Sequence, residues 1–310
     1  MYDLAGKRIW VAGHKGMVGR AVMRQLADYD CTLLTADRKA LDLTRQQQVE
    51  DWMAAQKPDA VIMCAARVGG ILVNNTQPAN FIYDNLMIEA NIIHAAFACH
   101  VEKLLFLGSS CIYPKHADQP MQEDALLTGA LEPTNQYYAI AKIAGIKLCQ
   151  AYRQQYDADF IAAMPTNLYG PFDNFDLQSS HVIPALMHKC HAAKQNKESA
   201  MEIWGSGKAL REFLHVDDCA AGIVFLLQHY ADMPHVNLGT GQDVTITALA
   251  QMLKKIIGFE GALIYDTSKP DGTPRKLLDV ATINKLGWQA NIDLADGLAT
   301  TYQWFLENSA

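Results

Sequence analysis

The chain has 310 residues, half of them hydrophobic, and a formal net charge of -7 at pH 7. Such a length and apolar content suffice for one large domain or two closely joined ones. The sequence has no basic stripe, which argues against a nucleic-acid surface, and no apolar run near the roughly 20 residues that cross a membrane.

Cysteine usage indicates a reducing compartment. The seven cysteines, an odd number, are scattered mostly in apolar runs, and none forms a CxxC pair. The chain enters its first predicted strand shortly after Met1 with no signal peptide ahead of it, so we expect a cytoplasmic protein. His188, Cys190 and His191 are close in sequence, but such residues diverge around a helix, and we expect no metal site there.

The first predicted strand, residues 8–12, leads into a glycine-rich turn and an amphipathic helix. Gly13 permits a tight turn, Gly16 admits a pyrophosphate against the backbone, and Gly19 lets helix and strand pack closely. The start of a helix also offers free N–H groups to phosphates. We therefore predict a dinucleotide site whose contacts are Gly13, His14, Lys15, Gly16, Met17, Val18 and Gly19.

The end of the second predicted strand, residues 32–35, distinguishes the two nicotinamide cofactors. An acid there accepts hydrogen bonds from a free ribose hydroxyl, whereas a cation favours a 2′-phosphate. Asp37 alone would indicate NAD, but Arg38, with Lys15 from the glycine turn, favours NADP(H). The alternative is that Arg38 belongs to a solvated turn. The residues expected near the adenine edge are Asp42 and Leu43.

Buried strands and helices then alternate. Apolar runs at residues 60–64, 104–107 and 160–164 are typical of buried parallel strands, and residues 67–75 are expected to form a loop. This alternation predicts an α/β fold with a doubly wound parallel sheet of Rossmann type. Residues expected to touch the cofactor after these strands are Ala65 and Ala66 and, near the nicotinamide, Pro165, Asn167 and Leu168.

The strand–helix pattern loosens after Pro171. We expect residues 1–172, with about 212–240, to form an NADP-binding domain. Residues 173–211 and 241–310 are expected to form a smaller C-terminal α/β substrate domain. It should close over the carboxyl edge of the sheet, where ligands bind in open α/β folds.

Two residues one helical turn apart form the centre of a predicted catalytic site. Tyr138 and Lys142 share a helix face, because residues four apart are neighbours on a helix. A phenol of pKa about 10 is a poor acid–base group at neutral pH, and a nearby cation favours its phenolate. We therefore expect Lys142 to lower the pKa of Tyr138 and to hold the nicotinamide ribose. Ser109, at a strand end, is placed to hydrogen-bond a reacting carbonyl oxygen.

Together these motifs resemble the extended short-chain dehydrogenase/reductases. Longer segments resemble, within that group, the GDP-L-fucose synthase family, and the match extends over essentially the whole chain. The segments that carry the resemblance are GSSCIYP at 108–114, EPTN at 132–135, AIAKIAG at 139–145, NLYGP at 167–171 and KPDGTPRK at 269–276.

The resemblance implies an NADPH-dependent enzyme acting on GDP-4-keto-6-deoxy-D-mannose. The family epimerises carbons 3 and 5 beside the ketone and then reduces carbon 4. Its cysteine and histidine for the epimerisations match Cys111 and His181, and His181 is also implied as a cofactor contact. Tyr138, with Ser109, would stabilise the enolate and donate the proton in the reduction. The implied substrate contacts are Lys189, Trp204, Arg211 and Asp271.

The resemblance also implies a homodimer, formed through the helices expected at residues 81–100 and 138–156. Several alternatives stay open. One is a sister enzyme on another GDP-4-keto sugar, such as a GDP-colitose-type synthase or a GDP-heptose epimerase/reductase. Another is a nucleotide-sugar 4-epimerase or dehydratase of the same fold, although a dehydratase usually has an acidic pair where Cys111 and Ile112 stand. The most remote is a non-catalytic NADP-sensing protein, which would commonly lack the tyrosine or lysine.

Overall fold

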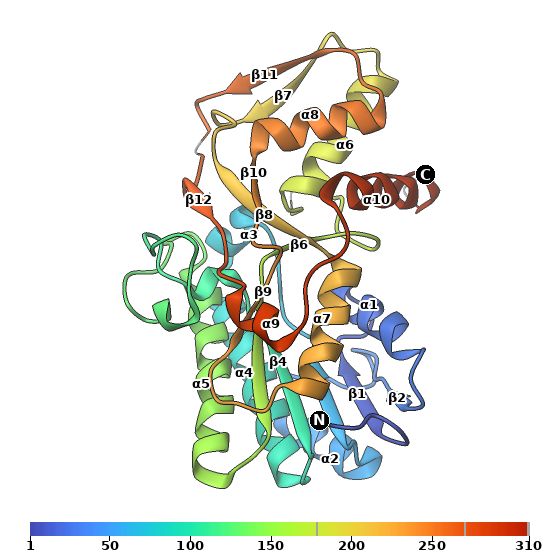
Figure 1. Cartoon of the computed structure of the whole chain (residues 1–310), viewed down its shortest axis with the longest axis vertical. Coiled ribbons are helices and arrows are strands. Elements are labelled where there is room, and N and C mark those ends of the chain that lie inside the picture. The colour runs from blue at the N-terminus through green and yellow to red at the C-terminus, as the bar shows by residue number, and fades with distance from the viewer. Residues whose placement is uncertain (178, 270, 309–310) are drawn as a thin grey trace.

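The computed structural model describes residues 1–177, 179–269 and 271–308. It has a large lobe built on a parallel sheet and a small lobe built from shorter strands and three helices, drawn at the bottom and top of Figure 1. The chain passes between the two lobes several times, as the mixed colours at their junction show (Figure 1).

The large lobe contains a six-stranded sheet with the order β2-β1-β3-β4-β5-β9, and every neighbouring pair is parallel. This confirms the predicted doubly wound sheet. Its strands are β1 (Arg8–Ala12), β2 (Thr32–Leu34), β3 (Ala60–Met63), β4 (Lys103–Leu107), β5 (Phe160–Pro165) and β9 (Val236–Leu238).

Helices cover both faces of this sheet because its central strands are apolar on both sides. Successive side chains of β4 point to opposite faces of the sheet. Leu105 packs in the core on one face, and Leu104 and Phe106 pack in the core on the other. On the Leu105 side lie α1 (Met17–Leu26), α7 (Val216–His229) and α9 (Ala281–Leu286), and on the other side lie α2 (Gln46–Gln56), α4 (Pro78–Ala98) and α5 (Gln136–Tyr156).

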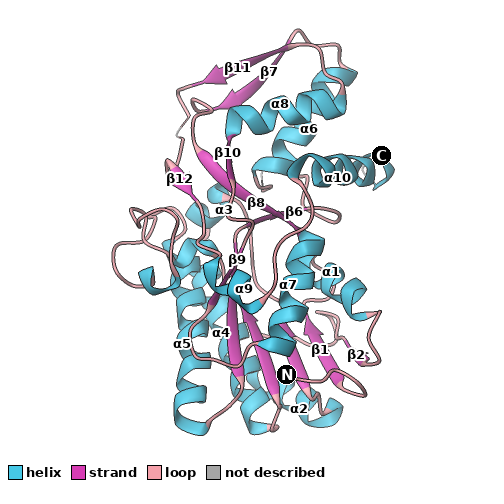
Figure 2. Ribbon diagram, in the orientation of Figure 1, coloured by secondary structure: helices cyan, strands magenta, loops and turns pink. Residues whose placement is uncertain are grey.

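The small lobe holds two further sheets, visible as the upper magenta strands of Figure 2. In one, β8 pairs with β10, β12 and β6, and in the other β7 pairs with β11. The strands are β6 (Asn167–Tyr169), β7 (Ala200–Trp204), β8 (Leu210–His215), β10 (Asp243–Thr245), β11 (Ala262–Asp266) and β12 (Arg275–Lys276). A third core lies between these strands and the helices α6 (Val182–Gln195), α8 (Ile246–Ile257) and α10 (Leu294–Asn308).

Most long elements fall where the sequence predicts them, but the helix α2 and the strand β8 are not predicted, and several short elements also differ. Within the expected loop at 67–75, residues Ile71–Thr76 form the helix α3. The last two residues of the KPDGTPRK segment form β12, because they pair with β8. Two side chains from the expected substrate domain, Ile283 and Trp288, pack in the core of the large lobe. Of the helices in the part of the chain described, none combines the length and apolarity needed to cross a bilayer.

A buried carboxylate joins the lobes. Glu212 of β8 has no exposed surface, and its Oε1 accepts hydrogen bonds from the backbone N–H groups of Thr240 at 2.6 Å and Gly241 at 2.8 Å. Its Oε2 accepts from the N–H of Leu278 at 2.9 Å. One side chain therefore holds β8 against the segments that follow β9 and β12. Charge-assisted bonds to N–H groups are strong when buried, so this contact fixes the lobe junction.

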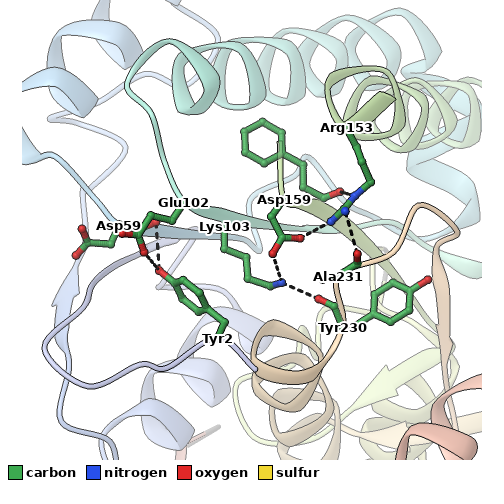
Figure 3. Close-up of polar contacts among 9 residues, drawn as sticks. Tyr2, Asp59, Glu102, Lys103, Arg153, Asp159, Tyr230 and Ala231 are labelled. Atoms are coloured by element: carbon green, nitrogen blue, oxygen red, sulfur yellow. Dashed lines mark hydrogen bonds and ion pairs between the residues drawn. The ribbon is translucent and has the colours of Figure 1, made fainter. Parts of the chain in front are cut away.

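A second buried charge lies at the amino end of the sheet (Figure 3). Lys103, at the start of β4, is 1% exposed, and its Nζ lies 2.6 Å from both Asp159 Oδ2 and the Tyr230 carbonyl oxygen. Arg153 reaches the other oxygen of Asp159 and the carbonyl of Ala231. Desolvation lowers the pKa of Lys103, and Asp159 opposes that shift.

The Asp159→Asn variant tests this cluster. It leaves the buried Lys103 ammonium beside a neutral amide, and because Asp159 is partly exposed we expect a loss of about 1–2 kcal/mol in the free energy of unfolding. Urea denaturation followed by circular dichroism measures it, with an unchanged m value showing that the unfolding transition is comparable. The exposed carboxylate variant Asp157→Asn serves as the control. Equal midpoints for both variants would contradict the role of the pair.

Candidate active site

The site lies at the carboxyl ends of the large sheet, and its first part is the glycine turn between β1 and α1. A Cβ added at Gly13, whose φ is +89°, would lie 2.7 Å from the backbone N of Ala65, and one at Gly19 would lie 2.2 Å from the Gly13 oxygen. Gly16 caps α1 without a side-chain hydrogen bond, and Met17 and Val18 form the first helical turn. The first N–H groups of α1 are thus offered to an anion, as a dinucleotide pyrophosphate requires.

The turn is linked to the end of β2 through Asp37. Lys15 Nζ lies 2.7 Å from Asp37 Oδ1, and His14 Nε2 lies 3.4 Å from the same oxygen. Lys15 accordingly lowers the pKa of Asp37. His14 Nδ1 is buried without a hydrogen-bond partner. With Asp37 neutralised and Arg38 exposed next to it, this corner can accept a negatively charged 2′-phosphate.

The remaining cofactor candidates follow the strands β2, β3 and β5. The Asp42 carboxylate accepts a hydrogen bond from the Thr44 hydroxyl, and the Leu43 carbonyl accepts one from the Asn91 side chain. Ala65 lies against Gly13, followed by the half-buried Ala66. Pro165 ends β5, Leu168 packs on the core, and Asn167 Nδ2 donates to the Glu212 carbonyl oxygen at 2.9 Å.

Ser109 and Cys111 stand directly after β4. Ser109 begins the short 3₁₀ turn η1 (Ser110–Ile112), and its Oγ accepts a hydrogen bond from the Cys111 N–H at 3.4 Å. Cys111 is 6% exposed. Burial raises the pKa of its thiol, while Lys276, Ser109 and Lys142 oppose that shift, Lys276 most strongly. The thiol is therefore held protonated, close to three groups that favour its anion.

Tyr138 and Lys142 lie on α5 facing this turn. The Tyr138 ring meets Phe81 of α4 edge-on, with ring centroids 6.3 Å apart, and the Lys142 Nζ lies 5.9 Å from the Tyr138 ring centroid. The expectation that Lys142 lowers the pKa of Tyr138 is wrong for this state of the protein. Burial raises that pKa well above its ordinary value, with Cys111 and Glu89 adding to the shift. The physical reason is first the burial of the phenol, and the Lys142 ammonium that would oppose it is engaged by Glu89, 3.0 Å away.

His181 reaches the same region from the small lobe. It is the N-cap residue of α6 and is exposed, yet enough protein surrounds it that desolvation lowers its pKa. The preceding residue, Ser180, and Ser179 contact Gly70, and Gly69 in turn borders the ring of Phe81. His181 is thus joined through these contacts to the helix that packs on Tyr138.

The four predicted substrate contacts gather on the small lobe. Lys189 Nζ of α6 lies 4.5 Å from the centroid of the Trp204 ring, which is 58% exposed. Arg211 of β8 donates to the Asp271 carbonyl oxygen at 3.4 Å, and the Asp271 carboxylate accepts from the Ser206 N–H at 2.6 Å. These contacts bring two cations and an exposed indole together. Pro270, in the motif beside Asp271, lies outside the described residues.

Two further residues belong to the site although the sequence reasoning did not single them out. Lys276 of β12 stands beside Arg211 in register, and it is the largest electrostatic influence on Cys111. Its signal is its position at the end of the KPDGTPRK segment. Glu89 pairs with Lys142, and its signal is a lone acid within the apolar stretch 86–93.

The cluster at residues 188–191 is explained by packing. His188 Nδ1 lies 3.0 Å from the Phe175 carbonyl oxygen, and His191 Nδ1 lies 2.9 Å from the Tyr302 hydroxyl. Cys190 is buried between them in the core of the small lobe. Within the described ranges, no group of three or more His, Cys, Asp or Glu side chains could hold a metal ion.

This arrangement can bind a phosphorylated dinucleotide on one side and an anionic ligand on the other. Between them lie the Ser109 hydroxyl and the Cys111 thiol after β4 and the Tyr138 phenol on α5. The His181 imidazole comes from the small lobe. Such groups can move protons on either side of a carbonyl compound.

Comparisons with known proteins agree with this reading. The NAD dependent epimerase/dehydratase family matches residues 9–239. A GDP-L-fucose synthase from Sinorhizobium fredii is 59% identical over 310 residues, 100% of this chain and 99% of that protein. One from Escherichia coli is 53% identical over 315 residues, 98% of each. A solved structure of a GDP-mannoheptose C4 reductase from Campylobacter jejuni with NADP bound is 36% identical, with a TM-score of 0.90, and the match covers 99% of this chain and 100% of that one.

The Arg38→Ala variant tests the corner beside Asp37. Removal of a charged donor to the 2′-phosphate should weaken NADPH binding about tenfold, while NADH binding stays within about twofold. Fluorescence titration with each cofactor measures both constants. Lys39→Ala, which removes the neighbouring exposed cation, is the matched control. Equal losses for NADPH and NADH would contradict this assignment of Arg38.

Proposed function

The chain belongs to the NAD dependent epimerase/dehydratase family, and we propose that it converts GDP-4-keto-6-deoxy-D-mannose to GDP-L-fucose. The reaction epimerises carbons 3 and 5 and then reduces the carbon 4 ketone with NADPH. One observation carries the proposal: Cys111 stands two residues after Ser109 in the turn that faces Tyr138. A plain ketone reductase needs one proton donor, whereas this site adds a thiol and an imidazole.

The added groups suit epimerisation next to a ketone. Carbon acids are inverted when a base removes a proton from one face and an acid returns one to the other face. Burial holds the Cys111 thiol and the His181 imidazole uncharged, so each can take one of these roles when the substrate is bound. Tyr138 and Ser109 can donate hydrogen bonds to the enolate oxygen that forms.

Reduction uses the same hydroxyl groups. NADPH supplies the hydride when it is bound at the glycine turn. Tyr138, whose pKa is raised by burial, is held as a phenol and can give its proton to the oxygen at carbon 4. Ser109 fixes that oxygen. Lys142, which also donates to the Leu107 carbonyl oxygen at 2.9 Å, is in reach of the end of β4, where the nicotinamide ribose is expected.

The substrate nucleotide suits the small lobe. Arg211 and Lys189 can neutralise a diphosphate, Arg211 with the better geometric specificity. The exposed ring of Trp204 can pack on a guanine or sugar ring, and Asp271 can accept hydrogen bonds from it. These contacts support a GDP-sugar, and the division into a cofactor domain and a substrate domain at about residues 172, 211 and 240 is part of the proposal.

A homodimer in the cytoplasm completes the proposal. Helices α4 and α5 pack together and carry exposed apolar side chains, including Tyr83 at 59%, Ile140 at 42% and Tyr156 at 51% exposed. A second copy could cover this face in a four-helix arrangement. Sedimentation of the purified protein tests the dimer, and a monomer at micromolar concentration would contradict it.

Isotope exchange tests the reaction. The protein is incubated with NADPH and GDP-4-keto-6-deoxy-D-mannose in deuterated water, and the product is examined by NMR. Deuterium at carbons 3 and 5 of GDP-L-fucose is the expected result, because both carbons exchange with solvent during epimerisation. Reduction without deuterium would leave a simple 4-reductase. If no turnover occurs, a 3-deoxy or heptose substrate that reacts instead would replace the proposed one.

The Cys111→Ser variant separates the two half-reactions. A serine hydroxyl is a much weaker acid than a thiol, so epimerisation should fall roughly 10²–10⁴-fold, while NADPH binding is retained. The NMR exchange rate measures the first and cofactor fluorescence the second. Cys190→Ser, a change at a buried thiol of the small lobe, is the control. A normal exchange rate in Cys111→Ser would remove the thiol from the mechanism.

A further inference from the structure

Glu89 is a buried carboxylate for which the proposed reaction has no direct use. It lies in the middle of α4, and its side chain is 2% exposed. Its Oε1 is 3.0 Å from Lys142 Nζ of α5, whose side chain is also 2% exposed. A charged pair so deeply buried is costly to maintain and contributes little net stability compared with an apolar pair. Its presence at this position therefore points to a use other than stability.

The interface between α4 and α5 leaves room for this pair. A Cβ added at Gly145 of α5 would lie 2.9 Å from Glu89 Oε2 and 2.4 Å from the Phe106 ring. Glycine at this position thus makes room for the carboxylate inside the helix interface. On its other sides the Lys142 ammonium meets the Leu107 carbonyl oxygen at 2.9 Å and the Phe106 ring centroid at 4.7 Å. These three neighbours of the ammonium are two acceptors and an aromatic face.

We propose that Glu89 is a positioning residue for the reduction: it fixes Lys142 beside Tyr138 and cancels its charge, so that Tyr138 stays protonated and can donate. The inference rests on the proposed function, because the proposed reduction takes its proton from the Tyr138 phenol. An unpaired ammonium at this distance would favour the phenolate, which cannot give a proton to the new alkoxide. With Glu89 in place the pair is neutral, and Lys142 remains available to a ribose hydroxyl.

The other titratable groups around the cluster agree with this role. Cys111 of η1 adds to the raised pKa of Tyr138, Lys142 opposes the raised pKa of Cys64 at the end of β3, and Glu89 adds to the raised pKa of Cys149 in α5. Lys276 of β12 acts on Cys111 from the substrate side. Burial raises the pKa of each of these thiols and therefore holds them uncharged. Burial raises the pKa of Glu89 as well, but Lys142 opposes that shift, and in the described part of the chain Glu89 is the carboxylate within ion-pair distance of Lys142.

Titration of Tyr138 without substrate tests the inference. Phenolate absorbance is followed against pH, and the signal of Tyr138 is isolated by subtracting the matched Tyr138→Phe protein. We expect Glu89→Gln to lower the pH at which Tyr138 ionises by at least about one unit, because the ammonium is then uncompensated. The double variant Glu89→Gln with Lys142→Gln should return towards the wild-type value, since both charges are gone. Unchanged ionisation in Glu89→Gln would overturn the proposal.

Two more variants keep the titration informative if Glu89→Gln does not fold or if it disturbs the packing. Glu89→Asp withdraws the carboxylate by one methylene and should produce a smaller shift in the same direction, so it replaces Glu89→Gln if that variant does not fold. Ile93→Val, one turn further along α4, changes buried packing without changing charge and should leave the ionisation as in the wild type. A shift as large in Ile93→Val would also overturn the proposal, because packing alone would then explain it.

The rate of NADPH oxidation completes the test. In Glu89→Gln the rate should begin to fall at a lower pH than in the wild type. The KM for the keto sugar should be unchanged. A changed KM with an unchanged pH profile would indicate a merely structural role. Failure of the proposed substrate is distinguishable, because the titration of Tyr138 requires no substrate and reports on Glu89 whatever sugar is reduced.

Discussion

The two lobes depend on the buried carboxylate of Glu212. Because it accepts the N–H groups of Thr240, Gly241 and Leu278, the strand β8 cannot shift without leaving a buried charge unsatisfied. The neighbouring residue in β8, Arg211, points to the substrate side, as alternation along a strand requires. The same strand therefore carries the Glu212 carboxylate on one face and, on the other, the cation that we propose to bind the diphosphate. The position of the substrate relative to the cofactor follows from that single strand.

Two charged side chains of the site are each paired with a side chain of opposite charge. Lys15 neutralises Asp37 at the cofactor corner, and Glu89 neutralises Lys142 beside the phenol. Cys111 and His181 are both held uncharged by desolvation. Charge is thus compensated at these two points, whereas Lys189, Arg211 and Lys276 bring cations to the small-lobe side of the site. In the proposed reaction, proton transfers would begin from a phenol, a thiol and an imidazole rather than from ions that would have to lose solvation first.

Much of the fold and part of the site could be predicted from the sequence. The glycine turn, the buried strands and the long helices have strong local signals, since glycine, apolar runs and helical periodicity act within a few residues. Strands β7, β10, β11 and β12 were not predicted, because their pairing joins distant segments: Lys276 finds Arg211 across the small lobe. The pKa of Tyr138 is also predicted in the wrong direction, because helical spacing shows neither how deeply the phenol is buried nor which groups surround its lysine. Its lysine is four residues away, but the acid that engages that lysine is on another helix, and helical spacing carries no information about it.

The path of the chain between the lobes has a consequence for modularity. After β12 the chain returns to the large lobe, where Ile283 and Trp288 fill its core, before α10 completes the small one. Neither lobe is therefore a continuous stretch of sequence. A gene fragment that encodes only the first part of the chain would lack core residues of the dinucleotide fold, and a fragment of the last part would lack β6 and α6. The two lobes must be inherited, expressed and recombined as one unit, so changes in sugar specificity are expected to arise by substitution within the small lobe rather than by exchange of it.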